Sequence, residues 1–114
     1  KALGKKAFDD LKNAGVRLFH KLGSVRHAIH AQKAGYDGVY AAGFEEGGHP
    51  LGDDVTTMVL TPRIADSVQI PVVTVGGIAD GRSMAAALAL GELPSVTGAV
   101  LPDHGCIDRM AADP

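Results

Sequence analysis

Tryptophan is absent from this chain of 114 residues, and aromatic side chains make up only 4% of it. A buried core must therefore be built mainly from the aliphatic side chains within the 46% of the sequence that is hydrophobic. Cys106 is the single cysteine, so a disulfide within the chain is excluded. This cysteine usage is typical of a reducing compartment, and we expect a cytoplasmic protein.

Long apolar runs and a large excess of one charge are also missing. No stretch approaches the roughly 20 apolar residues of a membrane-spanning helix. The formal net charge is −2, which provides no basic surface for nucleic acid or an anionic membrane. We therefore expect neither of these as a partner, and small molecules remain as the partners to consider.

Glycine is abundant, with 15 residues, and it separates helical patterns from extended ones. The patterns predict helices over residues 5–14, 25–34, 55–67 and 82–90, and strands over residues 16–20, 38–42, 70–75 and, more weakly, 96–101. Asp53 or Asp54 is expected to cap the third helix, and Asp80 the fourth. Pro62 predicts a break near Thr61, because proline removes a helical hydrogen bond.

The alternation of helices with aliphatic strands predicts a parallel α/β sheet with crossover helices. Residues 16–20 lack a strict alternation of polar and apolar side chains, which favours a strand buried on both faces. A doubly wound sheet and part of a (β/α)8 TIM barrel both fit this order. About three to four βα units are present, fewer than the eight of a complete barrel.

Both architectures bind ligands beyond the carboxyl ends of their strands. The predicted strands lead to Lys21, to the glycine-rich segment 43–50 (GFEEGGHP), and to Gly76 and Gly77. A glycine pair before a helix offers backbone N–H groups to a phosphate. His49 lies in the glycine-rich segment and can act as a general base near neutral pH, although it can also be an incidental histidine of a surface loop.

Two groups of residues have the composition of metal ligands. His27 and His30 lie three residues apart on a predicted helix, and His49 is followed by Asp53 and Asp54. We interpret the histidine pair as a solvated helix face and the aspartates as helix caps. No metal site is therefore expected.

Six segments resemble, in order and at matching spacing, the nitronate monooxygenase family, formerly called 2-nitropropane dioxygenases. They are residues 19–21 (FHK), 24–28 (SVRHA), 43–50 (GFEEGGHP), 53–57 (DDVTT), 70–73 (IPVV) and 76–82 (GGIADGR). The resemblance runs from about Val16 to Gly91. It implies a fragment of a flavin-binding TIM barrel over residues 1–91 and a divergent C-terminal tail over residues 92–114.

The resemblance also implies an activity, which is the FMN-dependent oxidation of alkyl nitronates or nitroalkanes by oxygen. His49 matches the family's active-site histidine, the base that removes the α-proton of a neutral nitroalkane. Lys21 and Gly43 are expected to contact FMN, and Gly76 and Gly77 to bind its phosphate.

Two other interpretations remain open. A flavin-dependent enoyl reductase of bacterial fatty acid synthesis resembles the glycine-rich segment and the Gly76–Gly77 turn as well. A non-catalytic half-barrel is the third interpretation, because an open parallel sheet with exposed edges favours self-association.

Overall fold

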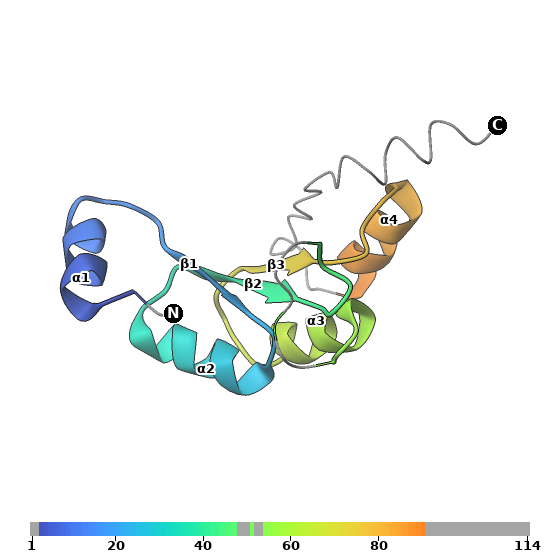
Figure 1. Ribbon diagram of the computed structural model, residues 1–114, viewed down its shortest axis with the longest axis horizontal. Helices are drawn as coiled ribbons and strands as arrows, with labels where there is room; N and C mark the ends of the chain where they lie inside the picture. Colours follow the sequence, from blue (N-terminus) through green and yellow to red (C-terminus); the bar gives the residue numbers. More distant parts are fainter. Residues whose placement is uncertain (1–2, 48–50, 52–53, 91–114) are drawn as a thin grey trace.

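The computed structural model describes residues 3–47, 51 and 54–90. Within these ranges, three strands form one parallel sheet and four helices accompany it (Figure 1). The elements in chain order are α1 (Lys5–Asn13), β1 (Phe19–Leu22), α2 (Val25–Ala34), β2 (Gly38–Ala42), α3 (Thr57–Ala65), β3 (Val72–Val75) and α4 (Gly81–Leu90). None of these helices is long and apolar enough to cross a membrane.

The strands lie in the order β1-β2-β3, so each strand pairs with its neighbour in the sequence. The parallel register places Lys21 beside Tyr40, and Tyr40 beside Val73. A doubly wound sheet reverses its strand order at a switch point, whereas a (β/α)8 barrel adds its strands in sequence. The described fold is therefore a part of a TIM barrel, as the family resemblance implied.

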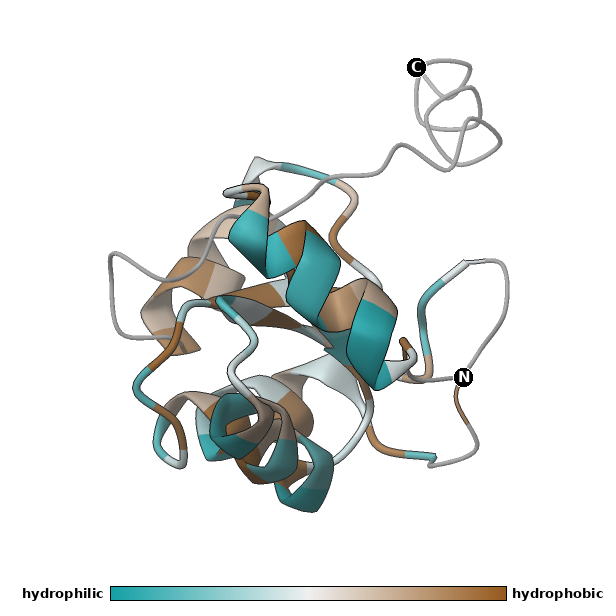
Figure 2. Ribbon diagram, turned by 90° about the vertical axis from the view of Figure 1, so that its left-hand side faces the viewer, coloured by the Kyte–Doolittle hydropathy of each residue, from teal (hydrophilic) through white to brown (hydrophobic). Residues whose placement is uncertain are grey.

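The hydrophobic core lies between the sheet and the helices α2 and α3, which cover the same side of it (Figure 1). Figure 2 shows helices that carry both hydrophilic and hydrophobic residues, as expected of helices that cover one side of a sheet. All buried members of the core are aliphatic: Leu22, Ala28, Ala31, Val39, Ala41, Leu60, Ile64, Val68 and Val72. This composition agrees with the scarcity of aromatic residues.

β1 differs from its predicted position and burial. It begins at Phe19 rather than at residue 16, because the Leu18 N–H donates to the Asp37 carboxylate at 2.8 Å instead of to a neighbouring strand. Phe19 is 39% exposed, so the predicted burial on both faces is wrong. Leu22, beyond the predicted end of this strand, is the last residue of β1 and belongs to the core.

α3 runs without interruption through Pro62, so the predicted break near Thr61 is wrong. The missing N–H of Pro62 would have bonded to the carbonyl of Met58, one turn earlier. Met58 is 53% exposed, which means that water can reach this side of the helix. The proline therefore removes one helical hydrogen bond at the protein surface, where water can bind the free carbonyl and lower the energetic cost.

The other described elements agree with the prediction within two residues at each end. Asp80 caps α4 as expected, because its carboxylate accepts the Ser83 N–H at 2.8 Å. Gly35 ends α2 with a left-handed φ of 93°, a conformation that favours glycine. The fourth strand predicted over residues 96–101 and the tail over residues 92–114 lie outside the described residues.

Candidate functional site

The carboxyl ends of the three strands meet at one edge of the sheet, and four of the five predicted site residues lie there. Lys21 is in β1, Gly43 follows β2, and Gly76 and Gly77 follow β3. His49, the predicted catalytic residue, lies outside the described residues. The structure thus brings together the residues that the resemblance assigned to the cofactor.

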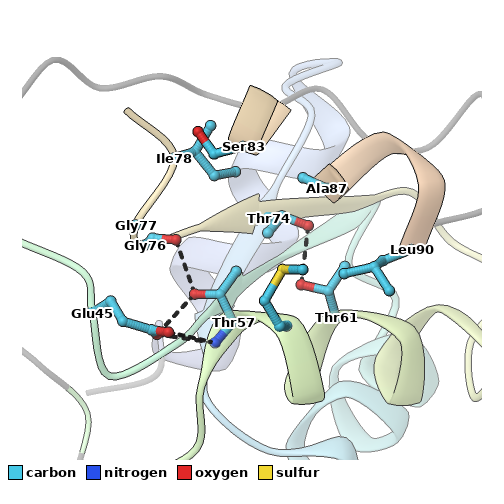
Figure 3. A pocket seen from close by; sticks show the side chains of 11 residues that line it. Glu45, Thr57, Thr61, Thr74, Gly76, Gly77, Ile78, Ser83, Ala87 and Leu90 are labelled. Carbon is cyan, nitrogen blue, oxygen red and sulfur yellow. Dashed lines mark hydrogen bonds between the residues drawn. The ribbon is translucent and has the colours of Figure 1, made fainter. Parts of the chain in front are cut away.

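Glu45 connects the glycine-rich segment to the start of α3 (Figure 3). Its carboxylate accepts the backbone N–H of Thr57 at 2.9 Å and lies 3.0 Å from the Thr57 hydroxyl. An acidic group at a helix N-terminus satisfies free N–H groups and interacts favourably with the helix dipole. Glu45 thus occupies the capping role predicted for Asp53 or Asp54; Asp53 lies outside the described residues.

The hydroxyl of Thr57 extends this connection to β3. Its oxygen lies 2.9 Å from the carbonyl oxygen of Gly76, as well as 3.0 Å from Glu45. A hydroxyl has one proton, so the two acceptors share a single donor. Thr57 therefore joins the loop after β2, the start of α3 and the turn after β3.

Gly43 is required by this close packing. A Cβ atom at Gly43 would lie 2.2 Å from the Thr57 hydroxyl oxygen and 2.5 Å from the Thr57 nitrogen, distances at which something must move. The Gly43 N–H donates to the Val75 carbonyl at 3.0 Å. The family resemblance implies a cofactor contact at Gly43, and the structure adds a packing reason for glycine that depends on the distant residue Thr57.

Gly76 and Gly77 form a turn that other residues adopt only with strain, with φ values of 115° and 70°. Neither N–H group donates a hydrogen bond to another residue in the described part of the chain. The helix α4 begins shortly afterwards, at Gly81. A pair of backbone N–H groups before a helix N-terminus can bind an anion such as a phosphate group.

Lys21 forms an ion pair with Glu46, through Nζ and Oε1. The Glu46 side chain is 3% exposed, while that of Lys21 is 43% exposed. Burial of a carboxylate is costly unless a cation compensates its charge, and Lys21 is such a cation. Glu46 had no predicted role, because nothing in the local sequence pattern shows that its side chain turns back toward β1.

A small pocket of about 60 Å³ opens beside this edge, between β3, α3 and α4 (Figure 3). The buried hydroxyl of Thr74 donates to that of Thr61 within it, at 3.2 Å. Ligand pockets usually exceed roughly 300 Å³, so this pocket is too small to enclose a flavin. Its lining comprises Glu45, Thr57, Met58, Thr61, Thr74, Gly76, Gly77, Ile78, Ser83, Ala87 and Leu90.

Histidines outside the glycine-rich segment do not form a metal site with other described residues. No group of three or more potential metal ligands occurs among the residues that the structure describes. His27 and His30 are exposed on α2, in agreement with a solvated face. Burial lowers the pKa of His20, and repulsion from His27 and His30 adds to this effect.

Comparison with known proteins identifies relatives over most of the chain. The family described as nitronate monooxygenase matches residues 2–99. A nitronate monooxygenase of Paraburkholderia phytofirmans is 39% identical over 96 residues, which cover 78% of this chain and 26% of that protein. A carboxyl-CoA dehydrogenase of Rhodococcus jostii, named for an octahydroindene substrate, is 46% identical over 81 residues, which cover 71% and 22%.

Solved structures support the same relationship. FabK from Thermotoga maritima is 48% identical with a TM-score of 0.70, and the match covers 75% of this chain and 27% of FabK. A nitroalkane oxidase from Streptomyces ansochromogenes is 29% identical with a TM-score of 0.71, covering 84% and 30%. The chain spans about a quarter of the length of its curated relatives. With this fold and a family match over residues 2–99, the chain belongs to the nitronate monooxygenase family, whose members are flavin-dependent oxidoreductases.

Proposed function

We propose that this chain contributes to the FMN-dependent oxidation of alkyl nitronates by oxygen, as part of a catalytic TIM barrel. The observation that carries the proposal is the meeting of Lys21, Gly43, Gly76 and Gly77 at the carboxyl edge of the sheet. Ligands bind at this edge in (β/α)8 barrels. The single cysteine supports a cytoplasmic location as part of the same proposal.

The glycine turn after β3 and Lys21 are suited to hold FMN. The Gly76 and Gly77 N–H groups would donate to the phosphate, close to the N-terminus of α4. Lys21 would contribute a cation at the same edge, and Gly43 would let the loop after β2 pack close to the site. When bound, FMN supplies the electron acceptor for the oxidation.

His49 is proposed to act as a general base toward neutral nitroalkanes. The nitro group acidifies the α-proton, so an imidazole titrating near neutral pH is strong enough to remove it. A preformed nitronate has already lost this proton and needs no base. The proposed role therefore applies to one form of the substrate only.

Oxygen consumption tests the proposed activity. The assay uses the chain joined to the flanking sequence of a complete barrel, reconstituted with FMN and supplied with an alkyl nitronate such as propionate 3-nitronate. Nitronate-dependent oxygen uptake is the expected result, and its absence in a protein that binds FMN would contradict the proposal. We expect the 114-residue chain alone to bind FMN weakly or not at all, because part of the phosphate site lies in other strands of the barrel.

An enoyl reductase is the second candidate. It is favoured by the likeness to FabK and by the Rhodococcus jostii relative, whose name describes a CoA thioester. The same reconstituted protein would then consume NADH with an enoyl thioester and take up no oxygen with a nitronate. That pair of results would replace the first proposal with this one.

A non-catalytic half-barrel is the third candidate. β1 and β3 are the edge strands of the described sheet, and unpaired edges favour association with further strands. Flavin titration separates this possibility from the first two. A protein that self-associates, forms no yellow complex and oxidises no nitronate would be a structural remnant of the family.

A further inference from the structure

We propose that Glu46 is a positioning residue that holds the Lys21 ammonium, and that this ion pair sets the reduction potential of bound FMN. The inference rests on the proposed flavin dependence and deepens it. It is drawn from the burial of Glu46, the register of β1 and the packing of the turn after β3. Neither the family resemblance nor the comparisons assign a role to Glu46.

The backbone of Glu46 is fixed from two sides. Its N–H donates to the Gly43 carbonyl at 3.1 Å, which closes a tight turn directly after β2. On the other side, the turn after β3 packs against it so closely that a Cβ atom at Gly76 would lie 3.0 Å from the Glu46 nitrogen. The backbone that carries the carboxylate is therefore held between the end of β2 and the turn after β3.

Lys21 lies on the face of the sheet opposite to the helices. It is in register with Tyr40, whereas the next residue, Leu22, points into the core formed with α2 and α3. Successive side chains of a strand point to opposite faces, so Lys21 extends on the face that lines the interior of a complete barrel. Its ammonium reaches Glu46 at the carboxyl edge, where ligands bind.

The pair has a direct electrostatic consequence for a flavin at this edge. Reduction by two electrons with uptake of one proton adds a negative charge to the flavin ring. The Lys21 ammonium would stabilise that charge, and the Glu46 carboxylate would offset part of the effect. Removal of the carboxylate charge should favour reduced FMN, and removal of the ammonium should favour oxidised FMN.

The test is a redox titration of the FMN-loaded barrel protein with dithionite, combined with measurement of the affinity for oxidised FMN. The variants are Glu46→Gln, Lys21→Met, the double variant, and Lys21→Arg, which keeps the positive charge. A matched control is Asp37→Asn, because Asp37 forms an ion pair with Lys12 at 2.8 Å away from the carboxyl edge.

Glu46→Gln is expected to increase the affinity for reduced FMN, relative to oxidised FMN, by about tenfold. Lys21→Met is expected to change the same ratio in the opposite direction, while the double variant and Lys21→Arg stay close to the unmodified protein. Asp37→Asn should leave the ratio unchanged. These five results together support the proposal.

Two outcomes would overturn the inference without affecting the proposed function. The first is a Glu46→Gln protein with reduced stability and an unchanged potential, which would show a structural role only. The second is an equal change in the affinities for oxidised and reduced FMN. This result would indicate that the Lys21–Glu46 ion pair acts on the phosphate of FMN, whose charge does not change on reduction, and not on the flavin ring. Failure of the unmodified barrel protein to bind FMN would overturn the proposed function and this inference together.

Discussion

The Glu45 carboxylate accepts the backbone N–H of Thr57 at 2.9 Å, across twelve positions of sequence. Replacement of Glu45 by alanine leaves the first turn of α3 without this acceptor. The free energy of unfolding should fall by about 1 kcal/mol, the usual cost of a lost helix cap. Urea denaturation followed by circular dichroism measures the change.

Two further variants separate the cap from a general effect of charge. Glu45→Gln keeps an acceptor oxygen and should lose only a fraction of the stability. Asp66→Asn removes an exposed carboxylate at the opposite end of α3 and should cost less than about 0.5 kcal/mol. Equal losses for Glu45→Ala and Asp66→Asn would show that the contact with Thr57 has no specific value.

Gly43→Ala is expected to be strongly destabilising. The added methyl group would lie 2.2 Å from the Thr57 hydroxyl oxygen, so the loop or α3 must move. Overpacking of this kind costs about 1–3 kcal/mol or more. Gly47→Ala is the control, because a Cβ atom at Gly47 has no described atom within 4 Å. A similar melting temperature for the two variants would disprove the packing role of Gly43.

Lys21→Met should reduce stability because it leaves the buried Glu46 carboxylate without its cation. We expect a loss of about 1–3 kcal/mol, less than for a fully buried pair, since the Lys21 side chain is 43% exposed. The double variant with Glu46→Gln removes the uncompensated charge and should recover part of the loss. Chemical denaturation of both proteins gives the comparison, and a double variant less stable than Lys21→Met would refute this account.

His49→Ala should separate the two forms of the substrate. Oxidation of neutral nitroalkanes requires removal of a proton, so we expect their turnover to fall by about 100-fold or more. Oxidation of preformed nitronates should be nearly unchanged in the same FMN-loaded protein. Initial rates of oxygen uptake with each substrate provide the test. Equal losses with both would indicate that His49 binds the nitro group instead.

Stability should decrease as the pH falls below neutrality, in part because of His20. Burial holds the pKa of His20 below its ordinary value of 6.5, so the unfolded chain binds a proton more readily than the folded one. The stabilisation is complete above pH 6.5 and is lost as the pH falls through the folded pKa. His20→Phe keeps a ring beside Tyr36 and should flatten this part of the profile. Melting temperatures at pH 5 to 8 measure the difference, and an unchanged slope would exclude His20 as its source.

Much of the fold could be predicted because its signals are local. Ser24 and Gly35 mark the ends of α2, and the Asp80 cap marks the start of α4. The start of β1 could not be predicted in this way, because it depends on the distant Asp37 carboxylate binding the Leu18 N–H. The effect of Pro62 was overestimated, since its position on an exposed part of α3 was not visible in the sequence.

In the candidate site, too, some features could be predicted from the sequence and others could not. Topology alone predicted that Lys21 and the turn of Gly76 and Gly77 share one edge of the sheet. The contacts of Glu45 with Thr57, and of Glu46 with Lys21, join residues on different elements. Such contacts follow from the close approach of three strand ends, so they cannot be predicted from a local sequence pattern.

The β1-β2-β3 order also has a consequence for how the chain acquires its structure. Within the described sheet, each strand pairs with the strand that precedes or follows it in the sequence, so paired strands are separated by a single helix and its loops. Chains with short sequence separation between contacting residues fold faster than chains with distant pairings. The described sheet can therefore form from pairings of short sequence separation, which favours rapid folding.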